Sequence, residues 1–325
     1  MENKQNLGCV FLILLFGIFC TFFGALNNGV KNIAFNGIKP VVPEKERQYH
    51  KVINKKKFVS IEVDVKRARV KILPGNEYSI RYQGKRANLP RISIDDNHLM
   101  ISQTNNILSE TTHSIHWKES SNVDRDNSII TITVPAKTKL HKIRIFNNYG
   151  TTSVLNIDTS VLEITEMEGG VVLKKVAADA VDLEAHAGRD MYLENVNLAN
   201  GQIQNTQTNL NFNNGLLKDV IFDIDQGSID ADSLIADNTM INSNHGNVTL
   251  NKLKIRNKLT INTQNGNNTI NNSNIDNYKL NVQNGKNQLF NNTQVANNQM
   301  QTLNQIKNNK GSLKITTING NNVVK

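Results

Sequence analysis

Residues 259–270 read LTINTQNGNNTI, two short alternating stretches joined at Gly266. Leu259 and Ile261 alternate with polar residues before the glycine, and Ile270 lies in the stretch after it. Alternation with a period of two is the pattern of a strand with one buried face. The sequence here therefore predicts a strand, a corner at Gly266 and a second strand.

The same glycine mark returns every 19 or 20 residues through the second half of the 325-residue chain. One interval of 39 residues spans two periods, and Thr208 stands where a glycine is missing. A fixed period of this length is typical of a solenoid. We expect an all-β parallel β-helix (β-solenoid) with rungs of about 19–20 residues. The marks are Gly150, Gly169, Gly188, Gly227, Gly246, Gly266 and Gly285.

Two apolar columns accompany the marks, one five residues before each glycine and one four residues after it. The residue four before the mark, such as Asn262, is polar. Because neighbouring strand residues point to opposite faces, we expect the two apolar columns inside and the polar one outside. The inward columns are Ile145, Ile164, Leu183, Ile203, Phe222, Ile241, Ile261 and Leu280, and Val154, Leu173, Tyr192, Phe212, Ala231, Leu250, Ile270 and Leu289.

Glycine at each corner is explained by a positive φ, which glycine adopts without steric cost. Asparagine is abundant in the rungs of 242–320, where its amide can donate to one neighbouring rung and accept from the other. Such ladders stabilise stacked strands. A genome that favours asparagine and lysine codons is an alternative explanation, and both can hold.

Residues 7–26 read LGCVFLILLFGIFCTFFGAL, 20 residues without a charge. This length suits one uncleaved transmembrane helix. Positive residues after the segment favour a cytoplasmic C-terminal side. We nevertheless expect the β region outside the cell membrane, since Cys9 and Cys20 are the only cysteines and the following segment resembles a spacer. The predicted parts are a tail (1–6), an anchor (7–26), a linker (27–57), an irregular β region that caps or starts the solenoid (58–142) and regular repeats (143–325).

The net charge of +9 is unevenly placed: +11 in residues 1–149, −11 in 150–250 and +9 in 251–325. A basic chain can bind nucleic acid. The acidic middle would repel a duplex, so we expect no nucleic acid partner. Solvated faces of an elongated protein explain the charge pattern, and an envelope polyanion bound to a basic end is the alternative.

The strand motifs resemble the bacterial "putative adhesin" β-strand-repeat family of unknown function, which includes LiaG-like envelope proteins. The motifs are FVSIEVDV (58–65), VKILP (70–74), LMI (99–101) and ITITVP (130–135), followed by the glycine-marked repeats. The resemblance implies a parallel β-helix on the cell surface, commonly of low-GC Gram-positive bacteria. It implies no catalytic or binding residues.

The best candidates for chemistry are four carboxylates, Asp223, Asp225, Asp230 and Asp232. Their predicted neighbours in adjacent rungs are amides and hydroxyls, with no basic residue in register. A solvated acidic face is favoured over a calcium site or a catalytic cluster. His113 and His116 could ligate a metal, but no third ligand supports them. We therefore predict no catalytic, cofactor-binding or metal-binding residues and no cofactor.

These observations predict a membrane-anchored, non-enzymatic cell-surface protein with an adhesin-like, interaction or structural role in the bacterial envelope. Its expected partners are the membrane, through the N-terminal helix, and a cell-wall polyanion, a glycan or an envelope protein. The alternative is a carbohydrate-active β-helix enzyme that acts on an envelope or extracellular polysaccharide. A groove lined by several carboxylates and a basic residue would favour the enzyme.

Overall fold

The computed structural model describes residues 32–36, 39–41, 49–53, 56–84, 88–103, 113–116, 128–273, 275–307 and 311–325. Every secondary-structure element within these residues is a β-strand, which confirms the all-β prediction. The predicted anchor at 7–26 lies outside them. None of the described segments forms a helix that could span a bilayer.

The chain divides into two units. The first, Met1–Gln48 with Asn105–Arg125, contains a three-stranded antiparallel sheet of β2 (Lys39–Val41), β1 (Asn32–Asn36) and β8 (His113–His116). The second, Tyr49–Thr104 with Asp126–Lys325, contains one continuous sheet of 20 strands. The predicted linker at 27–57 thus includes three strands, because β3 of the second unit also begins within it.

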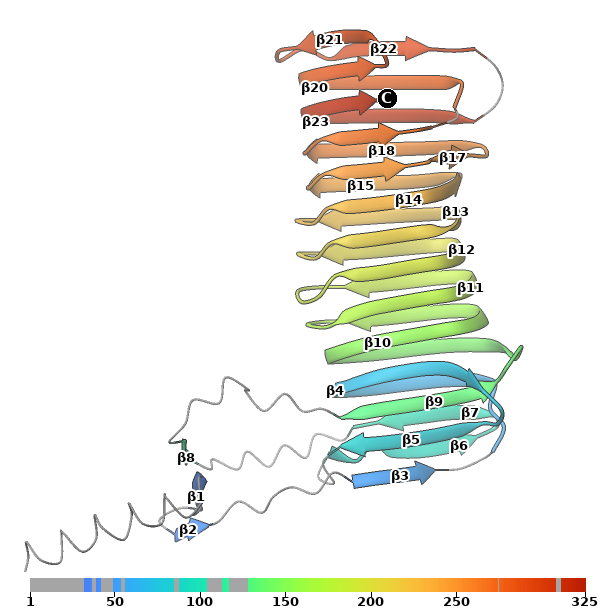
Figure 1. Ribbon diagram of the computed structural model, residues 1–325, viewed down its shortest axis with the longest axis vertical. Helices are drawn as coiled ribbons and strands as arrows, with labels where there is room; N and C mark the ends of the chain where they lie inside the picture. Colours follow the sequence, from blue (N-terminus) through green and yellow to red (C-terminus); the bar gives the residue numbers. More distant parts are fainter. Residues whose placement is uncertain are drawn as a thin grey trace, which may run out of the picture. The chain divides into compact units, whose positions relative to one another are not determined.

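The strands of the second unit form a stack (Figure 1). They are β3 (Tyr49–Ile53), β4 (Ser60–Gly75), β5 (Ser79–Gly84), β6 (Arg91–Asp95), β7 (His98–Ser102), β9 (Ile129–Pro135), β10 (Lys139–Glu166), β11 (Gly170–Ala185), β12 (Met191–Thr206), β13 (Leu210–Asp225), β14 (Ile229–Asp237), β15 (Thr239–His245), β16 (Val248–Asn251), β17 (Lys254–Ile255), β18 (Lys258–Asn265), β19 (Asn268–Asn271), β20 (Asn277–Leu289), β21 (Asn292–Ala296), β22 (Gln301–Gln305) and β23 (Ser312–Val324).

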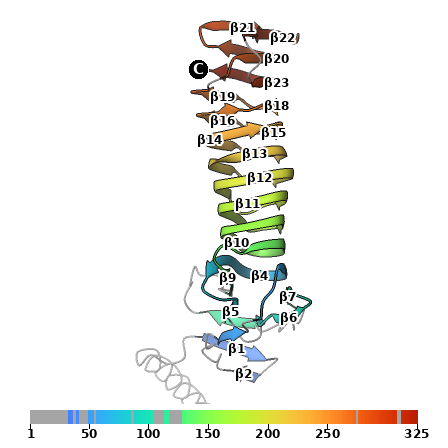
Figure 2. The same cartoon turned by 90° about the vertical axis from the view of Figure 1, so that its right-hand side faces the viewer.

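The pairing of these strands confirms the period read from the sequence. Ile164 pairs with Leu183 and Ile241 with Ile261, both in parallel register, at offsets of 19 and 20 residues. Figure 2, turned by 90° from Figure 1, shows the coils from the side on which β14, β16 and β19 are labelled, and these strands pair in turn. The second unit is therefore a solenoid-like stack of parallel coils. Its first coil lies within the region predicted as irregular, since β4 pairs in parallel with β10.

The two predicted inward columns are buried, with one exception. Ile241 and Ile261 are 1% and 0% exposed. Tyr192, placed inside by its distance from Gly188, is instead 49% exposed, and Leu193 is buried in its place. The coil before Tyr192 has one extra residue, so Val172 pairs with Tyr192 at an offset of 20. One added residue reverses which side chains face the core.

The glycines are needed mainly because neighbouring coils approach closely at the corner. A Cβ on Gly266 would lie 1.9 Å from the carbonyl oxygen of Gly246, and a Cβ on Gly246 would lie 1.8 Å from that of Gly227. Gly246 also has a φ of 155°, whereas Gly266 is not among the glycines with positive φ. The positive-φ explanation is thus incomplete, because close backbone approach is the property that these marks share.

A second corner recurs at residues whose φ lies between 53° and 61°. Asparagine tolerates this left-handed conformation better than most residues, and it occupies four of the seven positions. The corner residues are Asn156, Lys175, Asn195, Asn214, Ser233, Lys252 and Asn272. Their spacing of 19 or 20 residues shows that the whole coil repeats.

The last coils do not stack in chain order. β23 pairs in parallel with β18 on one side and with β20 on the other. The chain therefore leaves a one-strand gap after β18, forms β20 and the antiparallel strands β21 and β22, and returns to fill the gap (Figure 1). The prediction of regular repeats over 143–325 did not include this departure from chain order.

Candidate functional site

A hollow of about 550 Å³ opens over β12, β13, β15, β18 and β23. Most of the residues that line it carry amide, hydroxyl or carboxylate side chains. Because the strands are in register, like groups recur about every 4.8 Å across the coils. The lining includes Asp223, Asp225, Asn242, Asn244, Asn262 and Thr316.

Hydrogen bonds between coils fix these side chains. Asn262 Nδ2 donates to Asn242 Oδ1 at 2.9 Å, and Asn242 Nδ2 donates to Asp223 Oδ1 at 2.8 Å. In the parallel column, Asn244 Nδ2 donates to Asp225 Oδ1 at 3.0 Å. Each amide ladder thus ends on a carboxylate. A carboxylate accepts a hydrogen bond and has no N–H of its own, so it needs no acceptor on the next coil.

The same ending recurs elsewhere in the stack. Five aspartates each accept a hydrogen bond from an asparagine one coil later: Asp190, Asp219, Asp223, Asp225 and Asp237. This arrangement gives a structural reason for the acidic middle of the chain and the asparagine-rich part that follows. It also confirms the predicted asparagine ladders.

The four candidate aspartates separate onto two sides of the coils. Asp223 and Asp225 line the large hollow, whereas Asp230 lies in a second hollow of about 300 Å³ with Tyr192 and Glu194. No group of three or more His, Cys, Asp or Glu side chains is positioned to hold a metal among the residues that the structure describes. His113 and His116 lie in β8, and the absence of a metal at these two histidines stays a prediction.

The register partners of these aspartates are amides and hydroxyls, as predicted, but two basic side chains reach them from positions outside that register. Lys252 Nζ lies 3.2 Å from Asp232 Oδ1, and His245 Nδ1 lies 3.6 Å from Asp225 Oδ1. Lys252 was missed because it occupies a corner with a φ of 53° and does not follow strand register. Hydrogen bonds from Ser233 and Lys252 hold the pKa of Asp232 below its ordinary value.

Glu166 is a carboxylate inside the stack, with 0% exposure. Asn147 Nδ2 donates to Glu166 Oε1 at 3.0 Å, and the hydroxyl of Thr152 donates to the same oxygen. Burial raises the pKa of Glu166 to about 7, against the opposing effect of these donors. Glu166 Oε2 and Asn147 Oδ1 have no hydrogen-bond partner within the described residues.

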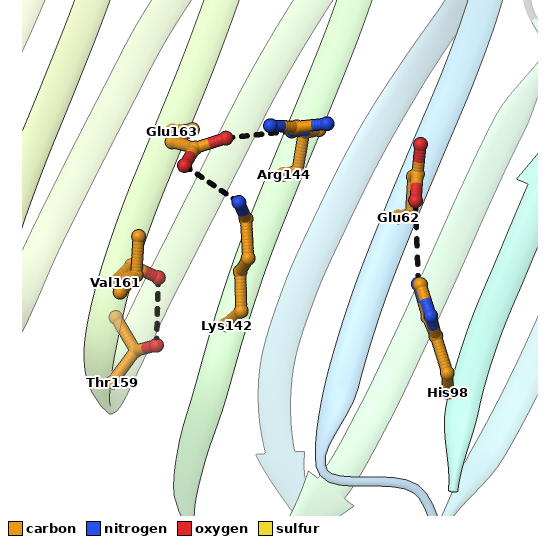
Figure 3. Close-up of polar contacts among 7 residues, drawn as sticks. All are labelled: Glu62, His98, Lys142, Arg144, Thr159, Val161 and Glu163. Atoms are coloured by element: carbon orange, nitrogen blue, oxygen red, sulfur yellow. Dashed lines mark hydrogen bonds and ion pairs between the residues drawn. The ribbon is translucent and has the colours of Figure 1, made fainter. Parts of the chain in front are cut away.

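A charged cluster occupies the coils at the other end of the same side as the large hollow (Figure 3). Glu163 accepts from Lys142 Nζ at 2.7 Å and from Arg144 Nε at 2.6 Å, and Glu62 lies 3.4 Å from His98 Nε2. Burial raises the pKa of Glu163, but the two basic partners outweigh it and leave that pKa below its ordinary value. Lys142 and Arg144 therefore share one carboxylate, which offsets part of their positive charge.

The family model for Toastrack DUF4097 matches residues 58–325. The chain belongs to the Toastrack DUF4097 family. The resemblance to a family of adhesin-like β-strand repeats is thereby confirmed. The hollow over β13 and β15 lies within the Toastrack region.

Solved structures similar to this Toastrack chain share little sequence with it. A "putative adhesin" from Bacteroides fragilis is 15% identical, with 87% of this chain and 99% of that chain covered and a TM-score of 0.43. A "putative adhesin" from Parabacteroides distasonis is 9% identical, with 86% and 97% covered and a TM-score of 0.42. Likenesses this distant carry no function to this chain. No curated protein matches it.

Proposed function

We propose that this chain is a non-catalytic, adhesin-like interaction protein of the bacterial envelope, built on a parallel β-solenoid, that binds a hydroxyl-rich polymer. The observation that carries the proposal is the large hollow and its lining of fixed amides and carboxylates. Sugar hydroxyls both donate and accept hydrogen bonds, as amides do. A glycan is therefore the ligand class that best matches the lining.

The rigidity of the lining supports binding. Asn242 is held from both neighbouring coils, with its amide nitrogen on Asp223 and its carbonyl oxygen accepting from Asn262. Each primary amide keeps a second N–H and a second lone pair for a ligand. Side chains that are already ordered lose less conformational entropy on binding, which favours affinity.

The same ladders favour binding over hydrolysis. Glycosidases use two carboxylates, one of which donates a proton to the leaving oxygen. Asp223 and Asp225 instead terminate amide ladders, each accepting a hydrogen bond from an asparagine. We therefore keep the non-enzymatic function as the proposal and treat polysaccharide cleavage as an outcome that its test can detect.

The location of the protein is also a proposal. The apolar segment at 7–26 is long enough to anchor the chain in a membrane, with the coils on the extracellular side. An envelope glycan or protein would then be within reach of the coils.

A glycan-binding measurement with two matched variants tests this function. Asn242→Ala with Asn262→Ala removes a ladder from the hollow, whereas Asn251→Ala with Asn271→Ala removes an Asn–Asn hydrogen bond of the same length, 2.9 Å, on another side. We expect the first variant of the full chain to bind an array glycan at least 10-fold more weakly and the second to bind normally. The reason is that a ligand hydroxyl buried without its hydrogen-bond partner costs about 1–3 kcal/mol.

Absence of glycan binding by the unaltered chain would contradict the proposal, as would equal losses in the two variants. Release of new reducing ends from a bound polysaccharide would favour the enzyme instead.

A further inference from the structure

One outward column of the stack ends in two uncompensated lysines. Lys314 on β23 pairs in register with Lys279 on β20, and both side chains are exposed. Neither ammonium has an ion-pair partner among the described residues. Like charges directly opposite each other on neighbouring strands destabilise a sheet. The pair therefore contributes nothing favourable to the stacking of β20 on β23.

The opposite end of the same side shows the contrast. There, Arg144 and Lys142 share Glu163, which lies one coil further along (Figure 3). Between the two ends, the column passes through Met240 and Thr260, and Thr260 pairs with Lys314. Positive side chains thus have an ion-pair partner at one end of this side, whereas Lys279 and Lys314 have none among the described residues.

The open lysines lie beside the large hollow. Thr316, which lines it, is two residues from Lys314 on β23 and points to the same side. Lys258 adds a third exposed charge, since it pairs in register with Ser312, two residues before Lys314. A ligand that fills the hollow would pass within reach of these ammonium groups.

We infer that Lys258, Lys279 and Lys314 form an anion-binding rim, and that the polymer bound in the hollow is an acidic polysaccharide. Its hydroxyls contact the amide lining, and its carboxylate or phosphate groups contact the rim. Lysine binds such anions as a point charge. This inference rests on the proposed glycan-binding function and adds the charge class of the ligand.

The test compares a double variant, in which Lys279 and Lys314 are both replaced by glutamine, with the single variant Lys218→Gln. Lys218 is an exposed lysine elsewhere in the stack. The probes are polygalacturonate for carboxylates, a phosphorylated dextran for phosphates and dextran as a neutral polymer. We expect the unaltered full chain to bind an acidic probe at least 10-fold more tightly than dextran, with affinity falling as salt is added. The double variant should lose that advantage, and Lys218→Gln should keep it.

Each outcome decides between the two proposals. Equal binding of dextran and both acidic probes would overturn the anion-binding rim and leave the glycan-binding function intact. Absence of binding to every probe and array glycan would overturn both. A duplex DNA that competes as strongly as the acidic polymers would overturn the polysaccharide assignment. Preference for one acidic probe identifies the anionic group.

Discussion

Replacing Ile261 with aspartate is expected to lower the free energy of unfolding by at least about 4 kcal/mol at pH 8. Ile261 is 0% exposed and is stacked in register between Ile241 and Ile315. A carboxylate there would have apolar neighbours on both sides and no donor to satisfy it. Chemical denaturation followed by circular dichroism measures the change.

The adjacent residue provides the control. Asn262 faces outward and donates to Asn242 at 2.9 Å, so Asn262→Asp should cost only about 1–2 kcal/mol, the value of one hydrogen bond. Equal losses of stability for Ile261→Asp and Asn262→Asp would show that the assignment of inward and outward positions is wrong.

Glu166→Gln is expected to stabilise the protein by about 3 kcal/mol at pH 8 and to change stability little at pH 4. The folded-state pKa of Glu166 is about 7, above the ordinary 4.5, because burial disfavours the charged form. The folded state therefore binds more protons than the unfolded state between these values, and stability falls as pH rises from 4.5 to 7. Glutamine stays neutral across this range, so its burial carries no cost of ionisation.

The measurement is the difference in unfolding free energy between the variant and the unaltered chain across this pH range. Glu163→Gln is the matched control, because the pKa of Glu163 is lowered by its basic partners and the loss of charge there should destabilise slightly. A difference for Glu166→Gln that does not depend on pH would contradict the ionisation of a buried carboxylate.

Much of the architecture could be predicted because successive coils bury side chains at equivalent positions. Ile241 and Ile261 occupy equivalent positions in successive coils, so one local pattern of alternation, repeated, specifies both burial and parallel register. Asn262 was correctly placed outside by the same pattern. Such predictions need only local sequence, since each coil contacts mainly its neighbours.

The parts of the fold that were not predicted depend on features that the sequence period does not encode. One inserted residue before Tyr192 moved that ring to the surface. The position of β23 between β18 and β20 depends on contacts between residues far apart in the chain. The same columns would be buried if the strands stacked in chain order, so the local pattern does not distinguish the two arrangements. The strands at Asn32–Asn36 and Tyr49–Ile53 lie in a segment that contains prolines and mixed charge.

The candidate site was predictable only in part. The outward position of Asp223 and Asn242 followed from strand alternation, but the hollow over them depends on how the coils curve. Lys252 reached Asp232 from a corner, which strand register could not anticipate. The lysine rim was foreseen only as an excess of positive charge near the end of the chain.

Cysteine cross-linking tests the central claim most directly, since the rim and the hollow both depend on the stacking of β18, β23 and β20. In a full chain with Cys9 and Cys20 replaced by serine, Asn262→Cys or Asn281→Cys is combined with Thr316→Cys, the register partner of both. Partners about 4.8 Å apart are within disulfide range. Positions 262 and 281 lie two strands apart, about 10 Å, beyond that range. We predict disulfides between 262 and 316 and between 281 and 316 after mild oxidation. A third double variant combines Asn262→Cys with Asn281→Cys. A disulfide between 262 and 281 in that variant, with none between 262 and 316, would contradict the account.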